Sequence, residues 1–85
     1  MTEVAGVVLS ATGEPLADVR VLFSLGPVAL PDVAALTDDR GRFSLTAPAP
    51  GAYELTAAAG DRTTTRQLRV DPGDDRVELE LRIDL

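Results

Sequence analysis

Five residue types are missing from this 85-residue sequence: His, Cys, Lys, Asn and Trp. Ser/His/Asp and Cys/His catalysis both need an imidazole to accept the proton of the nucleophile, so the lack of His excludes them. Without Cys, disulfide bonds and thiolate metal sites are also excluded. The missing residue types predict a protein that is not an enzyme, with no cofactor and with no catalytic, cofactor-binding or metal-binding residues.

Long apolar runs and basic residues are also scarce. No apolar run approaches the roughly 20 residues that span a bilayer, and the first six residues lack the basic and apolar regions of a signal peptide. We therefore expect no membrane insertion, whether the sequence is a short native protein or a piece of a longer secreted one. Acidic residues outnumber basic ones by 14 to 8, and the net charge of −6 disfavours nucleic acid as a partner.

What the sequence does contain predicts a small domain made of strands. Hydrophobic residues make up 45% of it, and we expect a single domain over residues 1–85. Short segments with a period of two recur between clusters of Gly, Pro and Asp, without a helical period. The predicted strands are Val4–Leu9, Asp18–Leu25, Val33–Thr37, Arg42–Thr46, Tyr53–Ala57, Arg62–Val70 and Val77–Ile83. Seven such strands predict an all-β, antiparallel Greek-key β-sandwich.

The segment Thr37–Leu45 contains the strongest turn signal of the chain. Asp38, Asp39 and Gly41 favour a tight reversal, because Asp side chains accept bonds from nearby backbone N–H groups and Gly adopts positive φ without strain. Phe43 then lies on the apolar face of the strand that follows. We predict a β-hairpin here, with one buried face.

The segment Arg62–Val70 is a candidate contact surface. The period that turns Leu68 and Val70 inward also turns Arg66 inward, so the first half of this strand is expected to leave the core. Its Thr63–Thr65 stretch is then either a solvated sheet edge or a place where another strand pairs, including a strand from a second copy.

A second candidate surface is the Gly- and Pro-containing loop Gly26–Asp32, whose middle is apolar. Val28 and Leu30 either fold over one open end of the core or form a small exposed apolar patch for a partner. The sequence leaves both interpretations open.

Two acidic clusters contain the oxygen ligands that Ca²⁺ prefers. They are Asp38 with Asp39, and Asp71 with Asp74 and Asp75. Neither follows the spacing of a Ca²⁺-binding loop, since Arg40 occupies the third position of the first cluster. Turn capping by these carboxylates is the favoured interpretation, so we assign no metal ligand. The three aromatic residues are in core phase, which leaves no exposed platform for carbohydrate.

Several short motifs resemble those of carboxypeptidase regulatory-like domains. They are Gly6-Val7-Val8, Gly13-Glu14-Pro15-Leu16, Val19-Arg20-Val21, Thr37-Asp38-Asp39-Arg40-Gly41-Arg42-Phe43 and Pro50-Gly51-Ala52-Tyr53-Glu54-Leu55. The resemblance implies a seven-stranded, transthyretin-like or Ig-like sandwich, usually a non-catalytic module of a secreted or cell-surface protein. The matching residues are scaffold, so no functional site is carried over. Tyr53 is expected to anchor a corner of the sandwich through its hydroxyl.

These observations predict a non-catalytic β-sandwich module that acts as a structural spacer or a protein-interaction domain, with a protein partner or a fused domain. One alternative is a carbohydrate- or calcium-binding module that uses the acidic turns. Another is a small subunit of a larger assembly, of the decoration or spike-tip type, with the Val28–Leu30 loop as its contact.

Overall fold

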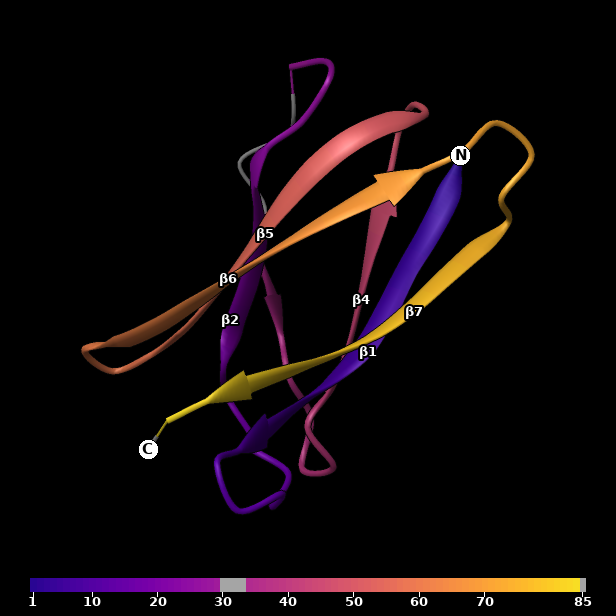
Figure 1. Cartoon of the computed structure of the whole chain (residues 1–85). Coiled ribbons are helices and arrows are strands. Elements are labelled where there is room, and N and C mark those ends of the chain that lie inside the picture. Colours follow the sequence, from indigo (N-terminus) through magenta and orange to yellow (C-terminus); the bar gives the residue numbers. More distant parts are fainter. Residues whose placement is uncertain (30–33, 85) are drawn as a thin grey trace.

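The computed structural model describes residues 1–29 and 34–84, and these form strands without a helix (Figure 1). The strands are β1 (Thr2–Ser10), β2 (Arg20–Leu25), β3 (Ala35–Leu36), β4 (Arg42–Ala47), β5 (Gly51–Ala59), β6 (Arg62–Val70) and β7 (Arg76–Ile83). Sheet A contains β4, β1 and β7 in that order, and sheet B contains β3, β2, β5 and β6. The prediction of an all-β sandwich with seven strands is confirmed. Val33, where the third strand was predicted to begin, lies outside the described residues.

The two sheets enclose an aliphatic core. In each strand, alternate residues point inward, because successive side chains of a strand lie on opposite faces. The buried cluster consists of Val4, Val8, Val19, Val21, Phe43, Ala47, Tyr53, Leu55, Ala57, Val70, Leu81 and Ile83. The half-buried Phe23 packs on Tyr53, with ring centroids 4.8 Å apart and an interplanar angle of 45°. Each large aliphatic side chain in this core contributes about 1.5–3 kcal/mol on burial.

Sheet A differs from the prediction in the direction of one strand. β1 is antiparallel to β4 but parallel to β7, with Gly6 opposite both Phe43 and Leu79. The prediction of an entirely antiparallel sandwich is therefore wrong for this sheet. Alternation fixes which residues of β7 face the core, and it gives the same inward residues for either direction of the neighbouring strand.

The predicted hairpin around Asp38 is also wrong, although the tight reversal is present. The Gly41 N–H donates to the Asp38 carbonyl, and the Asp38 N–H donates to the Arg42 carbonyl, both at 3.0 Å. However, β3 before the turn pairs with β2 in sheet B, whereas β4 after it pairs with β1 in sheet A. The turn therefore carries the chain from one sheet to the other. Backbone bonds of Thr37 with Asp18 and Val19 hold the incoming segment on sheet B.

Tyr53 anchors a corner of the sandwich, as expected. Its ring is buried, and its hydroxyl donates to the carbonyl of Ala49 and accepts the Ala49 N–H at 3.2 Å. This pair of bonds fixes the Pro-rich connection between β4 and β5 against the core. Without the hydroxyl, both backbone groups of Ala49 would lack these bonds.

We expect Tyr53→Phe to lower the free energy of unfolding by about 1–2 kcal/mol, the usual cost of leaving partly buried backbone groups without a partner. Urea denaturation of the two proteins measures this difference. Ser24→Ala is a suitable control, because the Ser24 hydroxyl also bonds a backbone carbonyl but lies in an exposed position. That control should change stability by less than about 0.5 kcal/mol. Equal losses in both variants would show that the hydroxyl of Tyr53 does not fix the corner.

Candidate interaction surface

The β6 strand forms one edge of sheet B. Within residues 1–29 and 34–84, β5 is the one strand hydrogen-bonded to it. The predicted edge position of Thr63–Thr65 is therefore confirmed. The two strands pair without a register shift from Ala59 opposite Arg62 to Gly51 opposite Val70. β6 thus presents a long, regular edge of nine residues.

The turn between β5 and β6 determines which backbone groups of β6 face outward. Gly60 has a φ of 62° whereas Asp61 has a negative φ, the pattern of a two-residue type II′ turn. The flanking pair Ala59–Arg62 then exchanges both hydrogen bonds, and bonded pairs alternate with non-bonded pairs along the ladder. The N–H and C=O groups that point away from β5 belong to Thr63, Thr65, Gln67 and Arg69.

A contact on the far side of β5 agrees with this alternation. Glu54, opposite Gln67 in the β5–β6 pair, directs its carbonyl toward β2, where it accepts a hydrogen bond from the Ser24 hydroxyl at 3.2 Å. The backbone of Glu54 therefore faces β2, which leaves the backbone of Gln67 for the free edge. We call the row of outward-facing groups from Thr63 to Arg69 the β6 edge.

Of the features by which proteins block strand addition, β6 lacks proline and bulges but carries edge charges. β6 contains no proline and no bulge, and its charges are Arg62, Arg66 and Arg69. Arg66 has the inward phase predicted for it, and its guanidinium donates to the Glu80 carbonyl on β7 at 2.9 Å. This bond covers an acceptor on β7 rather than on β6. The Thr63–Thr65 stretch carries no charge, so it is the part of β6 least protected against strand addition.

The acidic turns use their carboxylates within the chain. Asp38 Oδ1 accepts the N–H groups of Arg40 and Arg42, both at 2.9 Å. The bond from Arg42, followed by the bond from Arg40, holds the pKa of Asp38 below its usual value. In the second cluster, Asp74 Oδ2 accepts the Asp71 N–H at 3.0 Å. The described part of the chain contains no group of three or more acidic side chains arranged to hold a metal ion.

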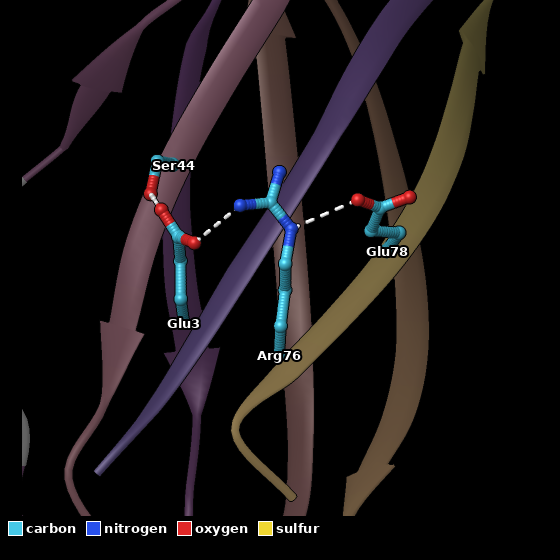
Figure 2. Close-up of polar contacts among 4 residues, drawn as sticks. All are labelled: Glu3, Ser44, Arg76 and Glu78. Carbon is cyan, nitrogen blue, oxygen red and sulfur yellow. Dashed lines mark hydrogen bonds and ion pairs between the residues drawn. The ribbon is translucent and has the colours of Figure 1, made fainter.

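The outer face of sheet A carries polar contacts that cross all three of its strands (Figure 2). Glu3 on β1 accepts bonds from Ser44 on β4 at 2.8 Å and from Arg76 on β7 at 2.6 Å. Arg76 also donates to Glu78 at 2.8 Å. Because these groups are exposed, each ion pair contributes about 0–1 kcal/mol. These side chains already bond one another, so this surface offers a partner fewer unsatisfied groups than the β6 edge.

Exposed apolar side chains lie near the ends of sheet B. Leu25 is 64% exposed because a register shift after Phe23 turns it outward. It borders a groove of about 690 Å³ that also reaches Gln67 and Arg69 of β6. Val28, one half of the predicted apolar patch, is 46% exposed, and Leu30 lies outside the described residues.

In the described residues no helix is long and apolar enough to cross a membrane.

A two-layer sandwich of this topology is a small β-sandwich module. The sequence model of the carboxypeptidase regulatory-like domain matches residues 3–84, so the chain belongs to this family. The resemblance noted from the sequence motifs is thereby confirmed. No curated protein matches the chain by sequence.

Two solved structures show a similar fold. Both are type II cohesin–X–dockerin complexes from Acetivibrio cellulolyticus, one with a C-terminal and one with an N-terminal interface mutant. The matching chains are 20% and 22% identical to this one, each with a TM-score of 0.66. In each case the match covers 98% of this chain and 57% of the other, so this chain spans little more than half of their length. At these identities the likeness shows the fold alone.

Proposed function

We propose that this domain is a non-catalytic protein-interaction module that binds an extended segment of a partner at the β6 edge. The observation that carries the proposal is the row of outward-facing N–H and C=O groups at Thr63, Thr65, Gln67 and Arg69. In strand addition, such main-chain groups supply the affinity, and the flanking side chains supply the specificity. The similar chains from the cohesin–X–dockerin complexes support the proposal, because those structures are protein–protein complexes.

The composition supports the non-catalytic part of the proposal. The chain has no His, Cys or Lys to act as nucleophile or general base. The carboxylates whose contacts are known serve the scaffold: Asp38 caps a turn, and Glu3 and Glu78 bind Arg76. A structural spacer is the competing function, and it predicts that the β6 edge binds nothing.

Nuclear magnetic resonance separates the two functions. The isotope-labelled domain is titrated with short synthetic peptides of alternating Thr and Val that carry Asp, Arg or no charge at their ends. We expect the amide signals of Thr63, Thr65 and Gln67 to shift more than those of Thr64 and Leu68, whose N–H groups bond β5. The absence of any shift in this row at millimolar peptide would overturn the proposal and favour the spacer.

The variant Thr65→Pro tests whether strand addition causes these shifts. Proline removes an N–H that points away from β5, so the sheet keeps its bonds and the domain should still fold. Peptide binding should be lost. Thr64→Pro is the matched contrast, because it removes an N–H that bonds β5 and should destabilise the domain instead. Unchanged peptide binding by a folded Thr65→Pro variant would place the contact elsewhere.

A further inference from the structure

We infer that the strand added to the β6 edge is β6 of a second copy, antiparallel to the first, with Thr65 opposite the partner's Thr65. This inference rests on the proposed function, because it names the partner of the same edge. Two identical strands that pair in this way are related by a two-fold axis, which gives a closed, self-complementary dimer. Sheet B would then continue into the sheet B of the second copy.

The alternation of β6 restricts the registers of such a dimer. Outward-facing residues must lie opposite outward-facing residues, since only these have free N–H and C=O groups. The axis can therefore pass through an outward-facing residue such as Thr65, or midway between two of them, at Thr64, Arg66 or Leu68. Each choice places a different set of charges opposite one another.

Charge favours the axis at Thr65. In this register Asp61, the turn residue just before β6, would lie across from Arg69 of the partner subunit, and Thr63 would lie opposite the partner's Gln67, each pair occurring twice. No like charges are opposed. An axis at Thr64 would place Arg62 opposite the partner's Arg66, and an axis at Arg66 would place that residue opposite its own copy. Like charges opposed across a sheet are destabilising.

The remaining registers lack this complementarity. An axis at Thr63 brings Asp61 opposite the partner's Thr65, and an axis at Gln67 brings Thr65 opposite the partner's Arg69. An axis at Leu68 brings Gln67 opposite the partner's Arg69, and an axis at Arg69 places that residue opposite its own copy. None of these registers forms an ion pair along the strand, and all of them use only part of it. Arg69 is available for the register at Thr65. It now pairs with Asp71 at 3.2 Å, but the side chains of Arg69 and Asp71 are 75% and 65% exposed, so this ion pair is weak.

Sedimentation equilibrium of the full chain at rising protein concentration, up to the millimolar range, tests the inference. We expect a reversible monomer–dimer equilibrium that Thr65→Pro abolishes and Ser24→Ala leaves unchanged. Asp61→Arg and Arg69→Asp should each weaken the dimer about tenfold, because each turns two attractive contacts into two repulsive ones. An equimolar mixture of the two variants should restore the dimer. The Asp61→Arg copy is positive at both positions 61 and 69, the Arg69→Asp copy is negative at both, and the two copies therefore attract one another. The double variant should restore it as well, because the exchange of charges leaves every pair attractive.

Several outcomes would overturn the inference. They are a monomer at every concentration, a dimer that survives Thr65→Pro, and a mixture of charge variants that associates no better than either variant alone. The experiments with the Asp61→Arg and Arg69→Asp variants remain informative even if the Thr65→Pro variant does not fold. The peptide titration decides the proposed function separately: peptide binding by a strictly monomeric domain would retain that function and reject the second copy as the partner.

Discussion

Gly6→Ala is expected to lower the free energy of unfolding by about 3 kcal/mol or more, a loss typical of severe overpacking. A Cβ atom at Gly6 would overlap with the carbonyl oxygen of Leu79 and would lie 3.0 Å from Cζ of Phe43. The first contact is with backbone, which cannot rotate away. Since β1 is the middle strand of sheet A, it cannot move from β7 without straining its bonds to β4. Urea denaturation measures the loss.

The sign of this effect is informative. Glycine inside a strand is about 0.5–1 kcal/mol less favourable than alanine, so Gly6→Ala would stabilise the domain if space were available. Gly13→Ala is the matched control, because no atom lies within 4 Å of its added Cβ, although its φ is +90°. That control should lose about 1 kcal/mol from backbone strain alone. A Gly6→Ala variant as stable as the native protein would show that β1 and β7 are not packed as closely as described.

The strands were predictable from the sequence because alternation is a local property. Val4 and Val8, or Leu81 and Ile83, identify the buried face of their own strand whatever lies beside it. The neighbour of each strand was not predictable in the same way. Nothing within β7 indicates that it runs parallel to β1, because this depends on the path of the whole chain between them.

The prediction of a hairpin around Asp38 was wrong for a related reason. Its turn chemistry was identified correctly, but turn residues specify a reversal and not the sheet to which each flanking strand belongs. The deciding contacts are those of Thr37 with Val19 and Leu16, which are distant in sequence. A buried hydroxyl of this kind has no sequence pattern to reveal it.

The β6 edge was partly predictable. The inward phase of Arg66 indicated that the first half of β6 leaves the core, which suggested an edge position for Thr63–Thr65. The outward-facing set could also have been found, since a two-residue turn with Gly60 first predicts a bonded pair at Ala59 and Arg62. The bond from Arg66 to the Glu80 carbonyl could not have been predicted from the sequence, because it joins the edges of two different sheets.

Thr37→Val is expected to lower the free energy of unfolding by about 2–4 kcal/mol. Thr37 is 3% exposed, and its hydroxyl accepts the Val19 N–H at 2.9 Å and donates to the Leu16 carbonyl at 2.7 Å. Valine has nearly the same shape, so the substitution creates no cavity. It removes the bond of a buried donor and of a partly buried acceptor, each of which costs about 1–3 kcal/mol when unsatisfied.

Two comparisons isolate the hydroxyl of Thr37. Thr46→Val makes the same chemical change at an exposed position of β4 and should alter stability by less than about 0.5 kcal/mol. Thr37→Ser keeps the hydroxyl and should retain more of the stability than Thr37→Val. Hydrogen exchange at the Val19 amide should also become faster in Thr37→Val than in Thr46→Val. If the two valine variants are equally stable, the hydroxyl does not hold the chain on sheet B before it crosses to β4, and the cause of that crossing must lie in the packing of β3 on β2.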